Sequence, residues 1–288
     1  MEINSEILAR HQAPAETLTA VPGCFTNWLG LKTDARLFPS RQGLEGRIFT
    51  DVPVPNDGVY GGWAEYSSLL TAIESCPDRK SFTAVELGAG WGPWISGIGI
   101  VCKRMGFQRI RLRGVEAHER KCEFMREHLT RNDLDDIECQ VIFGAAWKEN
   151  TTVQFPAIAE GDLGGAASSG LNDRDYRGHQ AKFVDVPAYS LNTICQDLDV
   201  VDYMHWDVQG AERQLAETGE EFLNQHVRYL FVGTHSRAIE GRLLELFFER
   251  RWELLYQNPC QFIYDRRKPT LEGMGRTDGE MFFKNPHF

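Results

Sequence analysis

The regular alternation of strand-like and helix-like segments limits this chain to very few folds. Apolar, strand-like segments occupy residues 82–87, 110–116, 137–147, 200–206 and 227–233, and amphipathic segments with helical spacing occupy 93–106, 117–133 and 238–251. A strand followed by a helix and a further strand forms a parallel crossover, and helices then cover both faces of the sheet. The pattern therefore predicts an α/β fold with a doubly wound, mostly parallel, Rossmann-like sheet.

The ends of the chain differ from this central pattern. Residues 1–58 are poorly periodic and rich in Pro, Gly and Thr, and a helix with apolar positions at Leu69, Leu70 and Ile73 follows at 63–76. We interpret residues 1–80 as an N-terminal extension with a lid helix, and residues 81–288 as the main domain. Three short extended segments at 252–257, 261–265 and 279–285 are expected to add antiparallel strands at one edge of the sheet. Two further strands are expected at 151–157 and 181–188, separated by a Gly- and Ser-rich loop at 160–178, and a short helix at 190–198.

Composition narrows the class of protein and its partners. The chain has 288 residues, 42% of them hydrophobic and 25% charged, as in an ordinary globular protein. A net charge of −10 disfavours a nucleic-acid partner, and no apolar run approaches the ~18 residues that would span a membrane. No signal peptide is recognisable, and the seven cysteines are scattered singly, which is typical of reduced thiols in a cytoplasmic protein. The sequence is compatible with a homo-oligomer but does not determine the oligomeric state.

A glycine-rich turn lies between the first strand of the alternation and its helix. The segment AVELGAGWGPW places Glu86, Gly88, Gly90 and Gly92 at this junction. Glycines allow the backbone to turn tightly and a ligand to approach closely. The spacing is G-x-G-x-G and differs from the G-x-G-x-x-G of dinucleotide-binding proteins. We predict ligand contacts from Glu86, Gly88, Ala89, Gly90 and Gly92; a turn with a purely architectural role is the alternative.

The ends of the next two strands carry features that suit a nucleoside. Glu116 ends the strand 110–116, where a carboxylate can accept hydrogen bonds from both ribose hydroxyls. The same placement would serve NAD, so it indicates a nucleoside without identifying it. After the third strand, small and aromatic residues could form a flat wall for an adenine ring, although simple core packing is an alternative. The predicted nucleoside contacts are Glu116, Ala117, Phe143, Gly144 and Ala145.

Titratable residues follow the strands at 200–206 and 227–233. His205 and Asp207 lie at the end of the first, and His235 at the end of the second. In a doubly wound sheet these ends share a rim with the glycine turn, so the side chains are expected to face a bound ligand. A histidine with a pKa near neutral is well suited to accept a proton. We predict His235 as general base, His205 as the second candidate, and Asp207 as a residue that orients the imidazole or contacts ligand; structural roles for the histidines are the alternative.

Two motifs together resemble a known enzyme family. The E-x-G-x-G-x-G of residues 86–92 resembles motif I of class I S-adenosylmethionine-dependent methyltransferases, and residues 190–212, with WDVQGAE, resemble the FkbM-type members. The resemblance extends over residues 82–256. It implies that Glu86, Gly88, Gly90, Gly92 and Glu116 contact the cofactor, and that Asp207, Gln209, Gly210 and Glu212 form the family's rim motif. Many members have glutamate at the position of Gln209 and before the strand-end histidine, where this chain has Gly233-Thr234-His235.

The family mostly methylates hydroxyl groups on sugars or sugar-containing natural products. The resemblance therefore implies an S-adenosylmethionine-dependent O-methyltransferase with a carbohydrate or sugar-containing metabolite as acceptor. One alternative is an NAD-dependent Rossmann-type enzyme, against which the glycine spacing counts. A second is a non-catalytic binding domain that retains the fold.

Two further hypotheses concern the rim. His205, Asp207, Glu212 and His235 contain enough donor atoms for a divalent metal, but their spacing matches no known metal motif. Aromatic residues near the expected mouth of the site could present a flat apolar face to a sugar, with packing as the alternative for each. These are Trp63, Trp91, Trp147 and Trp206.

Overall fold

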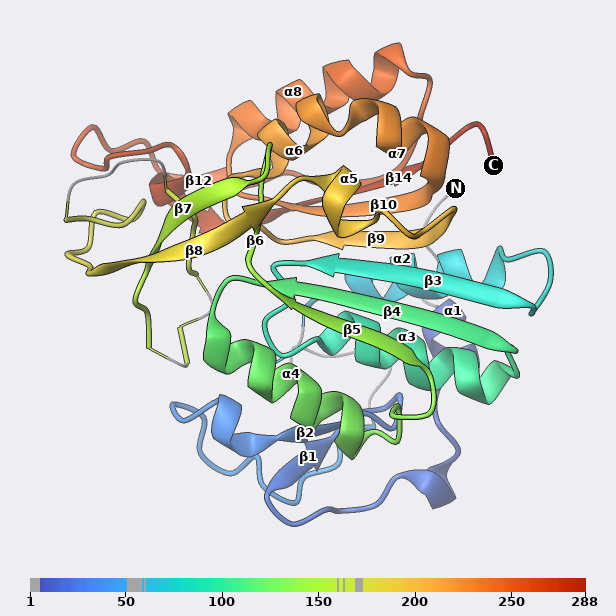
Figure 1. Ribbon diagram of the computed structural model, residues 1–288. Helices are drawn as coiled ribbons and strands as arrows, with labels where there is room; N and C mark the ends of the chain where they lie inside the picture. The colour runs from blue at the N-terminus through green and yellow to red at the C-terminus, as the bar shows by residue number, and fades with distance from the viewer. Residues whose placement is uncertain (1–5, 51–58, 60, 160, 163, 169–172) are drawn as a thin grey trace.

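The central feature of the computed structural model is a seven-stranded sheet (Figure 1). The structure describes residues 6–50, 59, 61–159, 161–162, 164–168 and 173–288. The strand order is β11-β14-β10-β9-β3-β4-β5. The parallel strands are β3 (Ser81–Leu87), β4 (Arg109–Glu116), β5 (Glu138–Phe143), β9 (Val201–Trp206) and β10 (Val227–Thr234). β14 (Gly279–Lys284) runs antiparallel to β10, and β11 (Glu253–Asn258) antiparallel to β14.

The direction in which strands are added reverses between β3 and β9. The chain first builds β3, β4 and β5 toward one edge, and later places β9 on the other side of β3, with Glu86 opposite His205 and Leu87 opposite Trp206. Such a switch point leaves a crevice at the carboxyl ends of the strands, which is where α/β sheets bind ligands. The prediction of a Rossmann-like sheet of the class I methyltransferase type, with antiparallel strands at the C-terminal edge, is confirmed.

Helices cover both faces of the sheet and enclose two apolar cores (Figure 1). One core packs beneath α2 (Trp63–Glu74), α3 (Pro93–Met105) and α4 (Glu119–Arg131). The other lies under α5 (Leu191–Ile194), α6 (Glu212–Thr218), α7 (Glu220–His226) and α8 (Arg237–Glu249). The chain after Gly210 forms two short helices, α6 and α7, which meet at Gly219. Within the described ranges, every helix is too short or too polar to cross a bilayer.

The N-terminal extension packs on the outer side of α3 and α4 (Figure 1). It contains α1 (Glu6–Arg10), β1 (Cys24–Thr26), β2 (Lys32–Asp34) and two 3-10 turns, Ala15–Thr17 and Ala35–Leu37. His128 of α4 joins the two layers, because its ring contacts the hydroxyls of Thr33 at 3.1 Å and Ser96 at 3.2 Å. Complete burial lowers the pKa of His128 to about 3. The extension thus shares a core with the sheet, and the division of the chain at residue 80 stays a prediction.

A second, smaller sheet projects beyond β5 (Figure 1). The segment expected as one strand at 137–147 breaks at Gly144, whose φ of 155° separates β5 from β6 (Ala145–Ala146). β6 then pairs with β8 (Phe183–Tyr189), which pairs with β7 (Thr151–Pro156). The two strands expected at 151–157 and 181–188 therefore exist, but they pair with each other outside the central sheet.

The prediction of an edge strand at 261–265 is wrong. The segment at 261–265 contributes only β12 (Gln261–Phe262), which pairs with β13 (Gly275–Thr277) in a separate ribbon beside a 3-10 turn at Glu272–Met274. Both residues of β12 are exposed, whereas β11 and β14 each place residues in the core. Without a buried face the segment has no apolar area to pack against the sheet.

Candidate functional site

The three glycines of the turn have positive φ angles but different surroundings. At Gly88 (φ 72°) an added Cβ would lie 1.8 Å from the carbonyl oxygen of Asp207, and at Gly92 (φ 71°) it would lie 2.7 Å from the side chain of Met125. At Gly90 (φ 55°) no heavy atom lies within 4 Å of that position. Gly88 and Gly92 are thus required by packing, whereas Gly90 is a buried residue whose Cβ position is unoccupied and which lines the rim cavity described below. The unoccupied position allows the close approach that a ligand bound against the turn needs.

Glu86 supports the turn from behind. Its side chain is 2% exposed, and its Oε2 accepts a hydrogen bond from the backbone N–H of Ile95 at 2.9 Å, in the first turn of α3. Burial raises the pKa of Glu86 well above its usual value. The carboxyl therefore caps α3, and the predicted cofactor contact of Glu86 stays a prediction.

Glu116 connects the end of β4 to the glycine turn. Its Oε2 accepts a hydrogen bond from Gly90 N–H and its Oε1 from His118 N–H, both at 2.7 Å. Each carboxylate oxygen has a second lone pair, so these bonds fix the carboxylate without exhausting its capacity to accept. The structure thus places the predicted ribose-binding residue against the glycine of the turn whose Cβ position is unoccupied.

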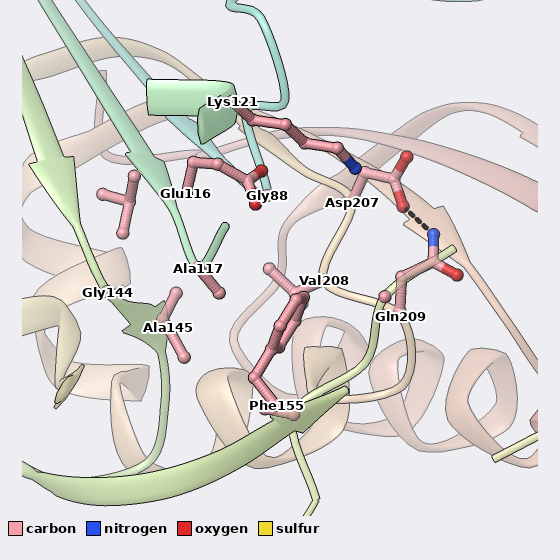
Figure 2. Close-up of a pocket in the computed structure, with 14 residues that line it drawn as sticks. Gly88, Glu116, Ala117, Lys121, Gly144, Ala145, Phe155, Asp207, Val208 and Gln209 are labelled. Atoms are coloured by element: carbon pink, nitrogen blue, oxygen red, sulfur yellow. Dashed lines mark hydrogen bonds between the residues drawn. The ribbon is translucent and has the colours of Figure 1, made fainter. Parts of the chain in front are cut away.

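An inner pocket opens beside these residues, between β4, β6 and the loop after β9 (Figure 2). It has apolar walls from Ala145, Phe155 and Val208. The pocket is small, with a volume of about 50 Å³. Of the predicted contacts, Gly88, Glu116, Ala117, Gly144, Ala145 and Asp207 line this pocket, and Phe143 is not among its lining residues.

Lys121 is a lining residue that the sequence analysis missed. It lies on α4, is 5% exposed, and its Nζ donates a hydrogen bond to the carbonyl oxygen of Asp162 at 2.6 Å. Burial lowers the pKa of Lys121, although the nearby carboxylates of Glu116 and Asp207 favour its charged form. Figure 2 shows the side chain extending over the pocket toward Asp207. A basic residue in the first turn of the helix after the nucleoside strand was the only available indication in the sequence.

A chain of polar contacts runs from Asp207 through His235 to Glu212. His235 is 3% exposed; its Nδ1 lies 2.8 Å from Glu212 Oε1 and its Nε2 lies 3.2 Å from Asp207 Oδ1. Burial by itself would lower the pKa of His235, but the two carboxylates raise it well above its usual value. The two carboxylates thus favour the protonated form of His235, and its predicted role as general base stays a prediction.

The two carboxylates of this array differ in exposure. Glu212 is fully buried and accepts hydrogen bonds from Gly210 N–H at 3.1 Å and Val208 N–H at 3.3 Å, so it orders the loop that follows β9. The side chain of Asp207 is 47% exposed and faces the cavity. The partly enclosed position of Asp207 would raise the pKa of its carboxyl group. The hydrogen bond and charge of His235 outweigh this effect and lower the pKa. Asp207 is thus the group of the array that a ligand can reach.

Gln209 ties the rim motif to a distant loop. Its φ is 52°, its Nε2 donates to Asp207 Oδ1 at 2.7 Å, and its Oε1 accepts from the Tyr176 hydroxyl at 2.9 Å. A glutamate at this position could not donate to Asp207 and would repel it. The departure from the family pattern at Gln209 therefore fixes the Asp207 carboxylate without adding a charge.

His205 has surroundings unlike those of His235. Its ring is 2% exposed and stacks on Phe231, with centroids 5.2 Å apart and an interplanar angle of 6°, and Trp94 lies 5.5 Å away on another side. Neither ring nitrogen makes a hydrogen bond, and Nε2 lies 3.5 Å from Glu65 Oε1. His205 therefore stands apart from the Asp207–His235–Glu212 array, although both line the same cavity.

This rim cavity, of about 430 Å³, extends from the glycine turn across the ends of β9, β10 and β14. It shares Gly88, Glu116, Lys121 and Asp207 with the inner pocket, so the two spaces are adjacent. Ala89 and Gly90 also line it. The sequence analysis missed several of its lining residues, which come from segments far apart in the chain. These are Glu65, Trp94, Phe231, Asp278 and Glu280.

The predicted aromatic mouth is only partly correct. Trp91 lines the rim cavity, and Trp63, 36% exposed, packs edge-on against Tyr256. Trp206 is fully buried, because neighbouring residues of a strand point to opposite faces and His205 takes the cavity side. Trp147 packs with the small sheet and Ala211, away from the rim cavity. Trp206 and Trp147 therefore do not contribute to the mouth.

The described part of the chain contains no set of ligands for the divalent metal considered from the sequence. No group of three or more His, Cys, Asp or Glu side chains there is arranged to hold a metal ion. Of the four residues considered from the sequence, Glu212 is enclosed by backbone N–H groups and His235.

Comparison with known proteins gives one full-length relative. A curated protein of Jannaschia sp. (strain CCS1), named "Putative methyltransferase", is 27% identical over 281 residues, which cover 94% of this chain and 96% of the relative. No family model matches the chain. The relative agrees with the resemblance to methyltransferases that the two motifs predict.

Solved structures with similar folds include two methyltransferases. Methyltransferase FkbM from Methylobacillus flagellatus KT is 12% identical with a TM-score of 0.44, over 73% of this chain and 46% of its own. The C-terminal domain of precorrin-6Y C5,15-methyltransferase from Rhodobacter capsulatus is 11% identical with a TM-score of 0.44, over 80% of this chain and 91% of its own. This chain spans less than half the length of the FkbM structure.

Proposed function

We propose that this protein is an S-adenosylmethionine-dependent methyltransferase that methylates a hydroxyl group of a small acceptor, a carbohydrate or sugar-containing metabolite. The observation that carries the proposal is the pairing of Gly90 with Glu116 at the switch point: the Cβ position of Gly90 is unoccupied, and the buried carboxylate of Glu116 accepts a hydrogen bond from its backbone N–H. The full-length similarity to a methyltransferase-named protein supports the same activity.

The residues around the turn fit this cofactor. Gly88 and Gly90 admit close approach of the methionine and ribose parts, and Glu116 retains lone pairs for ribose hydroxyls. Ala117, Ala145 and Val208 form the apolar walls that an adenine ring requires. When bound, S-adenosylmethionine supplies a methyl group on a sulfonium, which an aligned nucleophile can attack without further activation of the methyl.

The acceptor hydroxyl has to lose its proton as the new bond forms. With His235 protonated, the two carboxylates and the imidazolium of the array carry a net charge of −1, so the array can take up one proton. Asp207 faces the cavity, and we assign to its carboxylate the contact with the hydroxyl. His235 and Glu212 hold Asp207 in place. We therefore assign uptake of the proton to Asp207 and His235 together, in place of the predicted histidine base alone.

Labelled methyl transfer tests the proposal. The protein is incubated with methyl-labelled S-adenosylmethionine and a panel of sugars and sugar-containing metabolites, and products are identified by mass. We expect transfer by the wild type, loss of cofactor binding in Glu116→Ala, and retained binding without turnover in Asp207→Asn. Reduction of NAD by the same panel would support the dehydrogenase alternative, and normal S-adenosylhomocysteine binding by Glu116→Ala would contradict the site assignment.

A further inference from the structure

Four carboxylates from the acceptor half line the rim cavity. Glu65 comes from α2, Asp207 from the end of β9, and Asp278 and Glu280 from the segment that leads into β14. Lys121, at the cofactor end, is the only lysine or arginine among the described residues that line the cavity. The acceptor half of the site therefore has a strongly negative lining.

These charges are incompletely compensated by the protein. Among the described residues, Glu65, Asp278 and Glu280 form no ion pair with a lysine or arginine. Asp278 lies 4.0 Å from His235 Nε2 and Glu65 lies 3.5 Å from His205 Nε2, so Glu280 has the least compensation of the three. Glu280 Oε2 has only long contacts, 3.4 Å from Asn258 Nδ2 and 3.5 Å from the Tyr256 hydroxyl. Burial and the nearby carboxylate of Glu65 raise the pKa of Glu280. A cation placed between these two carboxylates would relieve their repulsion.

His205 independently points to a ligand at the same place. It lines the cavity, is 2% exposed, and has no hydrogen-bond partner on either ring nitrogen. Buried polar atoms without partners are rare in native proteins and indicate a missing ligand or solvent molecule. Because one nitrogen of a neutral imidazole is an acceptor, and Nε2 lies 3.5 Å from Glu65 Oε1, a donor group can bind His205 and Glu65 together.

Aromatic rings complete the surroundings of this acidic pocket. Trp94 and Phe231 flank His205 and line the cavity. Carboxylates combined with aromatic faces favour an organic cation, since both attract positive charge and the rings also cover apolar groups. A metal ion fits less well, because no suitable ligand set exists among the described residues.

We propose that the acceptor carries an ammonium group, bound between Glu65 and Glu280 above His205, next to the hydroxyl that is methylated. This inference rests on the proposed function and specifies its substrate class as amine-bearing alcohols, such as amino sugars and amino alcohols. A neutral sugar would leave the carboxylates uncompensated in a partly desolvated cavity.

Binding of paired probes tests this inference separately from the methyltransferase assignment. S-adenosylhomocysteine is titrated first, and its complex is then titrated with amino sugars and amino alcohols, beginning with glucosamine and ethanolamine. Each probe is paired with its neutral N-acetyl derivative, and Mg²⁺ is titrated alone. We expect at least a tenfold preference for the amine in one or more pairs and no competition by Mg²⁺.

Substitutions locate the binding. Glu65→Gln and Glu280→Gln keep the side-chain shape, and each is expected to weaken amine binding at least tenfold while leaving S-adenosylhomocysteine binding unchanged. Glu253→Gln, an identical charge change at an exposed position on β11, is the matched control and should bind like the wild type. Thermal unfolding verifies folding, and both cavity variants are expected to melt no lower than the wild type because they remove repulsion.

The outcomes separate the two proposals. Normal S-adenosylhomocysteine binding without preference for the amine in any pair, or amine binding unaffected by Glu65→Gln and Glu280→Gln, overturns the inference and leaves the methyltransferase proposal intact. Tight Mg²⁺ binding that is lost in the same variants also overturns it, in favour of a metal site. Amine binding without any S-adenosylhomocysteine binding would support the cation site and reject the methyltransferase proposal.

Discussion

The two halves of the site differ in how the chain builds them. Most of the cofactor half consists of the glycine turn, Glu116 and the small residues of the inner pocket, which follow β3, β4 and β5 in succession, and Phe155 and Val208 complete its apolar wall. The acceptor half combines α2, the ends of β9 and β10, and the start of β14, and its side chains are acidic and aromatic. The first half is thus encoded mostly by contiguous segments, and the second exists only after the sheet has formed.

This difference indicates distinct constraints on the two halves. In the cofactor half, backbone conformation and space are decisive, as the three positive-φ glycines show. In the acceptor half, charge is decisive, because His235 and Glu212 form a buried ion pair and further carboxylates surround the cavity. Substitutions in the cofactor half should therefore affect folding and cofactor binding. Substitutions in the acceptor half should affect turnover and its dependence on pH.

The largest effect is expected at His235. His235→Ala leaves the fully buried Glu212 without its cation, which costs about 3–5 kcal/mol of stability. Loss of a group in the proton-accepting array is also expected to lower kcat about 100-fold or more. Urea unfolding and single-turnover kinetics measure the two effects, with His235→Gln as the variant that keeps a hydrogen-bond donor. Full activity in His235→Ala would remove this residue from the mechanism.

Gly88 and Gly90 form a matched pair within the cofactor half. Gly88→Ala places a Cβ 1.8 Å from the Asp207 carbonyl oxygen and should destabilise the protein by at least about 3 kcal/mol. Gly90→Ala meets no atom and should cost only about 1 kcal/mol from its φ of 55°, while the new methyl group weakens S-adenosylhomocysteine binding. Denaturant unfolding measures the stability of the two variants, and calorimetry measures their binding of S-adenosylhomocysteine. Equal effects on stability would contradict the account of the turn.

Glu116 should affect cofactor binding more than folding. Glu116→Gln keeps an acceptor for Gly90 N–H but loses the charge and one acceptor oxygen, so S-adenosylhomocysteine binding is expected to fall about 10- to 100-fold, or roughly 1.4–2.7 kcal/mol. Glu123→Gln, on the exposed side of α4, is the control. Unchanged affinity in Glu116→Gln would move the ribose site elsewhere.

Two of the buried histidines, His128 and His235, should produce opposite pH dependences of stability. His128 is neutral in the folded state, with a pKa of about 3 against 6.5 when unfolded, so stability falls as the pH drops from 6.5 to about 3, by up to about 1.4 kcal/mol per pH unit. His235 has a raised pKa, so its contribution is complete below pH 6.5 and is lost as the pH rises through its folded pKa.

Single substitutions separate these two slopes. Urea unfolding across the pH range should show a shallower acid side in His128→Gln and a shallower alkaline side in His235→Gln. If both variants changed the same side, the protonation state assigned to one of the histidines would be incorrect.

The sequence predicted the features that local patterns encode. The strand–helix alternation, the glycine turn and Glu116 at the end of β4 follow from spacing within short segments, and the sheet order agrees with them. Prediction failed where the outcome depended on tertiary packing: β7 and β8 pair apart from the main sheet, and β12 has no buried face.

Within the site, the missed residues have a common cause. Glu65 and Glu280 are separated from the motifs by long stretches of chain, and no local pattern distinguishes them from surface glutamates. The pKa of His235 also depends on Glu212, whose placement in a first helical turn has an ordinary explanation in the helix dipole. Trp206 was misplaced because the side of the strand facing the cavity was not known until the register of β9 was fixed.

Calorimetric titration with S-adenosylhomocysteine is the direct test of the claim that the glycine turn and Glu116 form an S-adenosylmethionine site. A parallel titration with NAD is the control. We predict one site per chain with a dissociation constant on the order of micromolar for S-adenosylhomocysteine, and no heat from NAD. Binding of NAD alone, or of neither compound, would contradict the claim and leave the turn with a purely architectural role.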